Sequence, residues 1–351
     1  MTASISIIIP FRDKHATLDD TLASIAIQEV DVEAIIVDDG SSESPRSIVD
    51  AWASRIPGGV QLVTRRHRGA SAARNHGLAV ATGDKILFLD ADDLLAANCL
   101  ARFAAALDDE QADAALGSLA ELSTRDGSYR IGRMRRAVLP DFPADWLADD
   151  HVFGQTVLFR RSVLDAIGPW DETLARWQDT NHVLRLLLRS PRLAIVPGAV
   201  TLWRRDHHTI SSRASWAALA SAFTNVELVI DHLAKQGTLD THREAIAGYW
   251  RVLAGYGAEQ ANLAFATECL RRMRAIDPRD PLPPLEFRER MRVTGELARL
   301  GVHRLRDRLR RETWFVVANR DALLTAFETA LPPTASEPRT RPAPNRPAST
   351  T

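Results

Sequence analysis

Residues 85–93 read Lys-Ile-Leu-Phe-Leu-Asp-Ala-Asp-Asp, an apolar run that ends abruptly in three carboxylates. Four consecutive apolar residues after Gly83 and Asp84 predict a strand buried on both faces. Carboxylates gathered at the end of such a strand repel one another unless a cation neutralises them. Their oxygens suit Mg²⁺ or Mn²⁺, ions that keep open positions for the phosphates of a substrate. The stretch therefore predicts a metal-bridged diphosphate at the carboxyl end of a parallel sheet, where open α/β sheets bind ligands.

The length and composition are those of an ordinary globular protein. The 351 residues predict about two domains, and 45% of them are hydrophobic and 25% charged. A net charge of −1 supplies no field to attract nucleic acid, so we expect no nucleic-acid partner. Cys99 and Cys269 lack metal-type spacing and are expected to be buried and reduced, as is typical of the cytoplasm. No apolar run approaches the ~20 residues of a membrane span, and the N-terminus lacks a signal peptide's basic start.

Short apolar runs separated by helical patterns predict an α/β fold for the first part of the chain. Strand and helix in alternation, with short connections, indicate parallel βαβ units with right-handed crossovers. Buried strands are expected at residues 4–10, 34–37, 60–63 and 85–90, and further strands near 114–119, 155–159 and 193–196. Helices are expected between the first strands, then over 96–107, from 162, and over 180–188.

Three regions depart from this pattern. Residues 120–153 are less regular, carry a basic cluster at Arg133, Arg135 and Arg136, and are expected to form a loop-rich insertion over the site. From Ser215 strand signals vanish and long helical stretches follow. The proline-rich end has almost nothing to bury and is predicted to be disordered. The expected domains are an α/β domain over 1–212, a helical domain over 213–330 and a disordered tail over 331–351.

Five motifs occur in a specific order and spacing, although each alone is a weak signal. They are Ile9-Pro10-Phe11-Arg12-Asp13, Val37-Asp38-Asp39-Gly40-Ser41-Ser42, Gly69-Ala70-Ser71-Ala72-Ala73-Arg74-Asn75-His76-Gly77, Phe88-Leu89-Asp90-Ala91-Asp92-Asp93 and Gly168-Pro169-Trp170-Asp171-Glu172. Over about residues 4–212 the chain resembles the large inverting glycosyltransferase family 2. The resemblance implies the GT-A fold, a Rossmann-like α/β sheet that binds nucleotide sugars, here followed by an all-helical domain.

The resemblance also implies residues that bind the nucleotide. Pro10, Phe11, Arg12 and Asp13 occupy the family's first motif, but Arg12-Asp13 replaces the usual Tyr-Asn pair. Phe11 is therefore the aromatic residue left to contact the base.

Asp38 and Asp39 end the second strand beside the expected nucleotide pocket. In the family the second of these carboxylates accepts from a pyrimidine N–H or a ribose hydroxyl. The other interpretation is an Asp that caps the following turn, with Gly40 in a left-handed conformation.

Arg74 and Asn75 follow small residues, so the backbone can approach a ligand there. A guanidinium beside a diphosphate makes charge-assisted contacts. The other interpretation is a surface arginine on an Ala-rich helix.

Asp90, Ala91 and Asp92 are expected to contact the nucleotide sugar, and Asp92 and Asp93 to hold the metal ion, with Asp90 in support. An acidic turn that caps the next helix is the other interpretation. The family often carries Arg-x-His further on. This pattern fits Arg205 and His207, which makes His207 a candidate third metal ligand, although adjacent histidines in a loop are often merely exposed.

The general base must take the proton of the acceptor hydroxyl as its oxygen attacks the anomeric carbon. The family places it in a Glu-Asp pair that reads Gln178-Asp179 here, so Asp179 is the candidate. Capping of the helix over 180–188 is the competing role for this Asp. Asp171 and Glu172 are expected to be structural.

The expected reaction moves a sugar from a nucleotide diphosphate, expected to be a UDP-sugar, to an acceptor hydroxyl with inversion, aided by Mn²⁺ or Mg²⁺. The expected setting is cell-surface polysaccharide or glycoconjugate synthesis on a glycan or lipid-linked acceptor, in the cytoplasm or at the inner face of the membrane. A basic stretch, Arg288 to Arg311, could touch anionic lipid, or it could simply be a solvated face. The rival functions are a sugar nucleotidyltransferase, whose Gly-rich loop is absent after the first strand, and a non-enzymatic scaffold.

Overall fold

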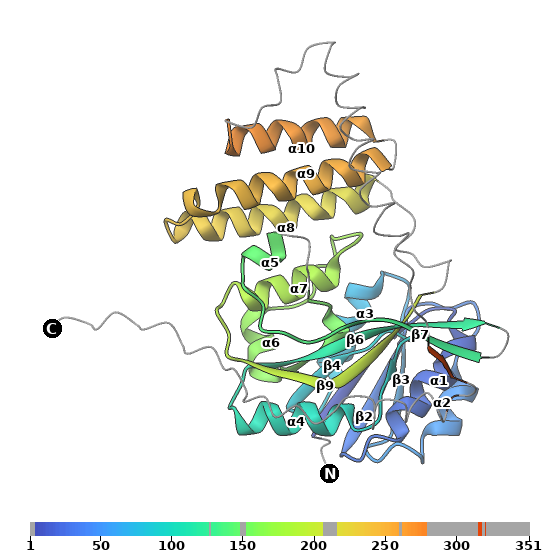
Figure 1. The fold of residues 1–351 in the computed structure, drawn as a ribbon. Helices are drawn as coiled ribbons and strands as arrows, with labels where there is room; N and C mark the ends of the chain where they lie inside the picture. Colours follow the sequence, from blue (N-terminus) through green and yellow to red (C-terminus); the bar gives the residue numbers. More distant parts are fainter. Residues whose placement is uncertain are drawn as a thin grey trace.

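The computed structural model describes residues 4–125, 128–147, 152–205, 216–259, 262–278, 315–317 and 320. Within them, one sheet runs in the order β10-β7-β6-β8-β4-β1-β2-β3, and β9 pairs with β5 and β6 (Figure 1). The strands are β1 (Ile5–Phe11), β2 (Val32–Asp38), β3 (Val60–Thr64), β4 (Lys85–Phe88), β5 (Leu94–Leu95), β6 (Ala114–Arg125), β7 (Ser128–Arg135), β8 (Val157–Arg160), β9 (Leu193–Arg204) and β10 (Phe315–Val317).

The parallel half of the sheet confirms the four strands expected in the first part of the chain. β1 lies between β2 and β4, parallel to both, and β2 pairs in parallel with β3. The strand at 85–90 ends as regular structure at Phe88, but Leu89 N still donates to Ile8 O at 3.0 Å. Apolar residues fill both faces of β1, β2 and β4 because helices cover both sides.

Helices sandwich this sheet. Ile5, Ile7 and Ile9 of β1 point into a cluster shared with α1 (His15–Ala26), α2 (Arg46–Trp52) and α4 (Cys99–Asp109). Ile8 points to the other face, where α6 (Arg161–Ile167) and α7 (Gln178–Leu187) pack. α3 (Ala70–Val80) covers β2 on that same side through Ala73. The period of two along β1 therefore assigns each residue to one of two apolar layers.

The expectation of a loop-rich insertion over 120–153 is wrong for its first half. β6 continues to Arg125 and pairs antiparallel with β7, so this segment is a hairpin arm of the sheet. Its core-facing side chains, among them Leu122 and Ile131, pack with Val200 and Leu202 of β9. The arginines interleaved along β7 hid this alternation in the sequence.

β9 is also longer than expected. Residues 193–196 pair with 114–117, the register then shifts, and residues 200–204 pair with 118–122. The expected strand ended at residue 196, but the chain accommodates Pro197 and Gly198 as an irregularity between two paired segments.

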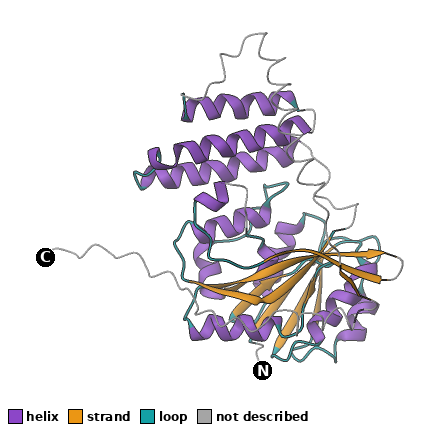
Figure 2. Ribbon diagram, in the orientation of Figure 1, coloured by secondary structure: helices purple, strands orange, loops and turns teal. Residues whose placement is uncertain are grey.

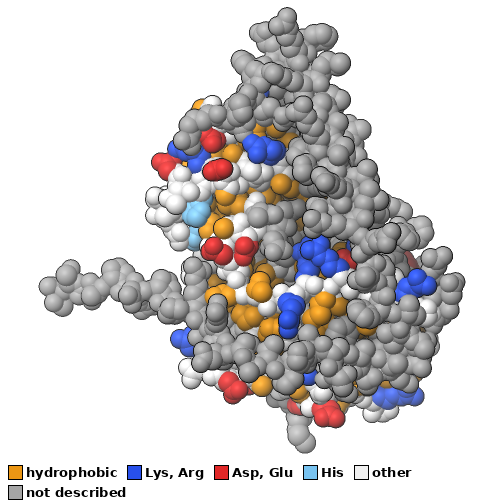
Figure 3. Space-filling model, in the orientation of Figure 1, with side chains coloured by type: hydrophobic (Ala, Val, Ile, Leu, Met, Phe, Trp, Pro, Cys, Tyr) orange, Lys and Arg blue, Asp and Glu red, His pale blue; other side chains and the backbone are white. Residues whose placement is uncertain are grey.

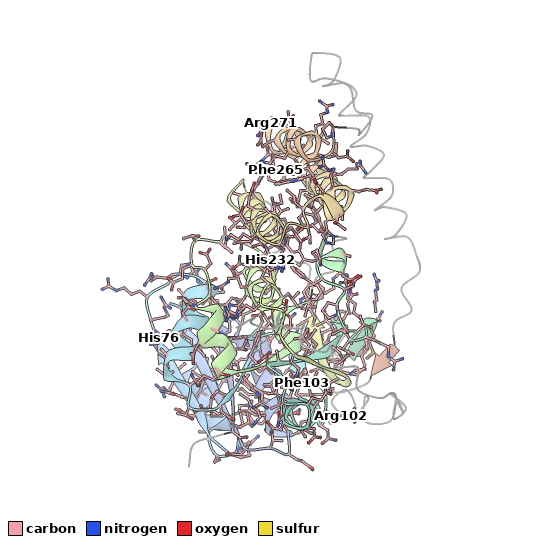
Figure 4. All side chains as sticks on the ribbon, turned by 90° about the vertical axis from the view of Figure 1, so that its left-hand side faces the viewer. His76, Arg102, Phe103, His232, Phe265 and Arg271 are labelled. Carbon is pink, nitrogen blue, oxygen red and sulfur yellow. The ribbon has the colours of Figure 1, made fainter. Side chains whose placement is uncertain are left out.

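A helical layer follows the sheet domain. α8 (Trp216–Lys235), α9 (Arg243–Glu259) and α10 (Leu263–Ile276) stack beside α5 (Ala144–Leu147) and α7, as Figures 1 and 2 show. Their shared cluster includes Trp250 and Phe265, both fully buried, and reaches Leu184 of α7. In Figure 4 Phe265 and Arg271 lie at the opposite end of the molecule from Arg102 and Phe103 of α4.

Several expectations concern parts of the chain beyond these elements. The described C-terminal region is helical, as expected, except for β10, a strand that pairs with β7 inside the range 213–330. The exact domain boundaries stay a prediction. The basic stretch Arg288 to Arg311 and the tail over 331–351 lie outside the described residues. Cys99 and Cys269 are both free and buried, as expected. Among the described helices, none is long and apolar enough to cross a membrane.

Candidate active site

The carboxyl ends of three parallel strands bring the sequence motifs to one edge. Phe11 at the end of β1 is in register with Asp38 at the end of β2, and Ile8 with Phe88 at the end of β4. The residues that follow these strands therefore gather where open parallel sheets bind ligands (Figure 1).

Asp39 anchors the loop that leads into α3. Its Oδ2 accepts from His67 Nδ1 at 2.6 Å and from Gly69 N at 2.7 Å. Its Oδ1 accepts from Arg68 N at 3.0 Å and lies 3.3 Å from Arg65 Nε. Because these donors use the acceptor capacity of the carboxylate, Asp39 shapes this edge of the sheet mainly by holding the loop.

Asp38 caps the turn after β2, as the second interpretation of this pair proposed. Its Oδ1 accepts from Ser41 N at 2.9 Å. Gly40 has φ +78°, and a Cβ there would lie 2.9 Å from His67 N. A side chain at Gly40 would therefore push against the loop that Asp39 holds.

The first motif is split between core and surface. Phe11 is 1% exposed, and its ring meets His15 edge-on, because odd residues of β1 face the α1 side of the sheet. Arg12 is exposed instead, with Nη1 2.7 Å from His67 Nε2. Asp13 accepts from both the backbone and the hydroxyl of Ser42 at 2.8 Å, and these bonds lower the pKa of its carboxyl. Pro10, which precedes Phe11, is partly buried.

Two of the three carboxylates at the tip of β4 pair with basic side chains, and the third accepts from a backbone amide. Asp90 Oδ1 accepts from Arg74 Nη2 at 2.6 Å, and Asp92 Oδ2 accepts from Lys14 Nζ at 2.6 Å. Asp93 is 1% exposed, and its Oδ1 accepts from Arg204 N at 3.0 Å. Burial, and then the neighbouring carboxylates, raise the pKa of Asp92 and raise that of Asp93 well above its usual value. Ala91, between Asp90 and Asp92, is buried, and its carbonyl accepts from the hydroxyls of Thr17 and Thr21.

Arg74 is part of a stack that extends into the core. Its guanidinium lies 4.5 Å from the centre of the Trp170 ring, and Trp170 in turn stacks on His182 at 4.2 Å with 9° between the planes. Burial, and then the charges of Arg185 and Arg74, lower the pKa of His182 well below its usual value. His182 is therefore a neutral spacer that holds Trp170 beneath Arg74.

Asn75 has a structural role. Its Oδ1 accepts from Trp170 N at 2.8 Å, and its Nδ2 donates to Trp170 O and to Glu172 Oε1 at 3.0 Å each. Its amide thus ties α3 to the segment that leads towards α7. Asp171, which accepts from Thr173, has a local structural role as well.

Asp179 lies in the first turn of α7, partly buried, close to this stack. The helix is preceded by Trp177 at φ 52°, with no side-chain cap, so Asp179 is not the residue that caps α7. Burial raises the pKa of its carboxyl, while the charge of Arg74 lowers it and that of Asp90 raises it. A Cβ on Gly154 would lie 3.3 Å from Asp179 Cβ, so the 3₁₀ turn η1 (Gly154–Thr156) borders the carboxylate.

The part of the chain that forms this edge matches a known family. Residues 6–168 match the family described as Glycosyl transferase family 2. This segment is a family 2 glycosyltransferase domain. Its motif residues from β1, β2, α3 and β4 all lie inside the matched range.

Individual relatives agree with this assignment. The Bacillus subtilis minor teichoic acid biosynthesis protein GgaA is 26% identical over 213 residues, which are 57% of this chain and 47% of GgaA. The chain thus spans about half the length of that relative.

Solved structures confirm the GT-A type of fold expected from the resemblance. Staphylococcus aureus TarS 1–349 in complex with UDP-GlcNAc has a TM-score of 0.55 at 15% identity, over 78% of this chain and 92% of TarS. The Pyrobaculum calidifontis mannosyltransferase PcManGT, in complex with GDP-Man and Mn²⁺, has a TM-score of 0.50 at 19% identity, over 88% of each chain.

The glycosyltransferase domain offers few ligands of its own for a divalent ion. Among the described residues, no cluster of three or more His, Cys, Asp or Glu could hold a metal. Asp93 Oδ2 is buried without a hydrogen-bond partner among the described residues, and Asp92 Oδ2 accepts from the Lys14 ammonium group. These carboxylates fit a divalent ion that has one or two protein ligands and whose remaining coordination positions are filled by phosphate oxygens of a substrate. His207 lies outside the described residues.

Two basic residues of the glycosyltransferase domain were not anticipated from the sequence. Lys14 Nζ meets the Asp92 carboxylate across 78 positions of sequence. Arg204 donates to Asp93 Oδ1 through its backbone amide, across 111 positions, and its Nε donates to Asp92 O. The place of Lys14, directly after the first strand motif, was the one available signal. Arg205, which fits the Arg-x-His pattern, has Nη1 3.0 Å from Glu121 Oε1.

Proposed function

We propose that the glycosyltransferase domain transfers a hexose from a UDP-sugar to an acceptor hydroxyl with inversion, aided by Mn²⁺ or Mg²⁺. One observation carries this proposal. A carboxylate with a raised pKa, Asp179, lies beside the Arg74–Asp90 ion pair at the edge where β1, β2 and β4 end. A base, a cation for a diphosphate and an acidic tip on one edge are the parts that sugar transfer needs.

The donor diphosphate would lie against Arg74. Arg74 Nε and Trp170 Nε1 are both buried without a hydrogen-bond partner among the described residues. Buried donors of this kind favour a ligand that brings acceptor oxygens, because leaving them unpaired costs free energy. Asp90, held by Arg74, is then placed to accept from the ribose, while Arg12 and the loop held by Asp39 border the base.

Asp92 and Asp93, with His207 as a further candidate, would hold the divalent ion. When bound, such an ion offsets the charge that develops on the leaving diphosphate. Lys14 adds a second positive charge at the same tip. PcManGT, whose complex contains GDP-Man and Mn²⁺, supports this choice of metal.

Asp179 would act as the general base. Its carboxylate accepts the proton of the acceptor hydroxyl while that oxygen attacks the anomeric carbon opposite the departing diphosphate, which inverts the configuration. Its raised pKa makes it a stronger base than an exposed aspartate, and such proton transfer contributes about 10²–10⁴ in rate.

The acceptor would be a glycan or lipid-linked chain in cell-surface polysaccharide or glycoconjugate synthesis. The name of GgaA, a minor teichoic acid biosynthesis protein, supports this setting. The cytoplasm or the inner face of the membrane is the proposed location.

A nucleotide-sugar panel tests the donor. UDP-sugars with Mn²⁺ should raise the melting temperature of the protein, because a ligand that binds only the folded state stabilises it. Release of UDP from the hit then defines transfer. Release of inorganic diphosphate from a nucleoside triphosphate and a sugar 1-phosphate would indicate a nucleotidyltransferase instead. No calorimetric heat from UDP with Mn²⁺ would indicate a scaffold.

A pair of variants tests the base. Asp179→Asn should abolish transfer while donor binding persists. Asp171→Asn, which changes a partly exposed turn carboxylate bonded to Thr173, is the matched control and should retain transfer. Full activity in Asp179→Asn would remove this residue from the mechanism.

A further inference from the structure

A pocket of about 240 Å³ opens between the β6–β7 arm and the chain that leads into β8. Its lining includes Leu116, Arg133, Arg136, Val138, Phe153 and Thr156. The sequence motifs of the glycosyltransferase domain contribute nothing to it. On the face shown in Figure 3, basic and apolar side chains lie close together below the helical layer.

The pocket adjoins the candidate base. Phe153 and Thr156 line it, and Gly154 between them approaches Asp179, where an added Cβ would lie 3.3 Å from Asp179 Cβ. η1 therefore contributes Phe153 and Thr156 on its flanks to the pocket and contacts Asp179 through Gly154. A chain seated in the pocket would begin one short turn from the residue that must take a proton from the acceptor.

The charge of the lining is predominantly positive. Arg133, Arg135 and Arg136 face one aspartate, Asp145, whose Oδ2 already accepts from Asp141 N at 2.7 Å. Arg133 and Arg136 are exposed, and neither forms an ion pair with a carboxylate of the described residues. Two guanidinium groups beside a cavity without such partners favour an anionic ligand.

One wall of the pocket is an aromatic stack. The guanidinium of Arg135 lies 5.3 Å from the centre of the Phe153 ring, and Phe153 stacks on Trp203 of β9 at 5.9 Å with 28° between the planes. Val138, on the rim, is 64% exposed. The stack orients the Arg135 guanidinium against this wall.

We propose that this pocket binds the acceptor and that the acceptor carries a phosphate group, either within a phosphodiester chain or on a lipid. A tetrahedral phosphate offers oxygens in several directions, so arginines at different points of the rim can share it. A planar carboxylate is satisfied by one guanidinium fork. The inference rests on the proposed function, because it identifies the pocket through its nearness to the base.

Binding of four small probes at low ionic strength tests the proposal. A synthetic glycerol-phosphate hexamer represents the phosphodiester chain, and octyl phosphate below its micelle concentration represents a lipid phosphate. Maltohexaose and octyl glucoside are their uncharged counterparts. A galacturonic acid hexamer supplies carboxylates in place of phosphates.

The variant Arg133→Gln/Arg136→Gln should weaken binding of the phosphate probe at least about tenfold, since two charge-assisted contacts are lost. The matched control is Arg46→Gln/Arg189→Gln, which removes two exposed arginines elsewhere and should bind as the wild type does. Melting temperatures of both variants verify that each is folded.

The outcomes distinguish a phosphodiester chain from a lipid phosphate, and they show whether the pocket recognises a phosphate group at all. Arginine-dependent binding of the hexamer identifies a phosphodiester chain, and arginine-dependent binding of octyl phosphate alone identifies a lipid phosphate. Unchanged affinity in Arg133→Gln/Arg136→Gln, no binding of either phosphate probe, or equal binding of the galacturonic acid hexamer overturns the proposal. Binding of UDP and Mn²⁺ to the wild type, measured by calorimetry, does not involve this pocket. Absence of that binding would overturn the proposed function, whereas the acceptor probes test only the pocket.

Discussion

The Nζ atom of Lys14 lies 2.6 Å from Oδ2 of Asp92. These side chains come from the ends of β1 and β4, and the parallel pairing of the two strands brings them together. The ammonium group occupies one oxygen of a carboxylate that we propose as a metal ligand, so the proposed ion would compete with lysine for Asp92.

Replacing Lys14 by Met should therefore raise the affinity for Mn²⁺ without nucleotide by about two- to fivefold, since a partly exposed ion pair is worth up to about 1 kcal/mol. Titration of free Mn²⁺ by electron paramagnetic resonance measures this change. Lys235→Met, at the end of α8, is the control and should bind as the wild type does. Equal affinities of wild type and Lys14→Met would show that the two cations do not compete.

Asp179→Asn should stabilise the fold at neutral pH although it abolishes transfer. Because burial raises the pKa of Asp179 above its usual value of 3.8, the folded wild type carries an unfavourable charge once the carboxyl ionises. The cost is present above the folded pKa and disappears as the pH falls towards 3.8. Urea unfolding at several pH values should show a gain for Asp179→Asn at pH 7 that vanishes in acid. A gain independent of pH would refute this cause.

The pH dependence of transfer should reflect the same group. Activity should rise as pH increases through the raised pKa of Asp179 and then level off, because only the ionised carboxylate accepts a proton. The rate at saturating donor and acceptor reports this titration. A flat profile across the acid range would argue for another base.

His182 should make the protein sensitive to mild acid. The pKa of His182 in the folded protein is far below the usual 6.5. Below pH 6.5, His182 is therefore protonated in the unfolded chain while it is still neutral in the folded protein. Stability should fall as pH drops below 6.5, by up to about 1.4 kcal/mol per pH unit. In His182→Phe, which keeps an aromatic ring against Trp170, this slope should be smaller. Denaturant unfolding between pH 7 and 5 compares the two slopes, and equal slopes would exclude His182 as the sensor.

Substitutions at Gly40 and Gly59 allow the free-energy cost of backbone strain to be measured separately from that of steric crowding. Gly40 (φ +78°) and Gly59 (φ +84°) are both left-handed, but a Cβ meets His67 N at 2.9 Å only at Gly40, while nothing lies within 4 Å at Gly59. Gly59→Ala should cost about 1–2 kcal/mol from the backbone alone, and Gly40→Ala should cost more. Gly40→Ala should also weaken donor binding, because it displaces the loop held by Asp39. Similar losses of stability in both variants would indicate that the loop at His67 moves away from the added Cβ at little cost.

Much of the fold could be predicted from local patterns. The apolar runs of β1, β2 and β4 end in motif residues, so their parallel pairing and the gathering of Asp39, Asp90 and Asp92 at one edge follow from strand topology. The β6–β7 arm could not be predicted in this way, because interleaved arginines on β7 conceal its alternation. Its apolar side becomes visible only beside β9.

The amino-acid sequence by itself determined which residues end the parallel strands, since apolar runs and their terminal carboxylates are local features. Only the tertiary structure decided their partners: Lys14 for Asp92, Trp170 and His182 beneath Arg74, and the arginine-lined pocket beside Asp179. The physical reason is that charge pairing and ring stacking act over a few ångströms of space. Residues that are 78 or 95 positions apart in sequence reach that range only when the sheet and its covering helices are assembled.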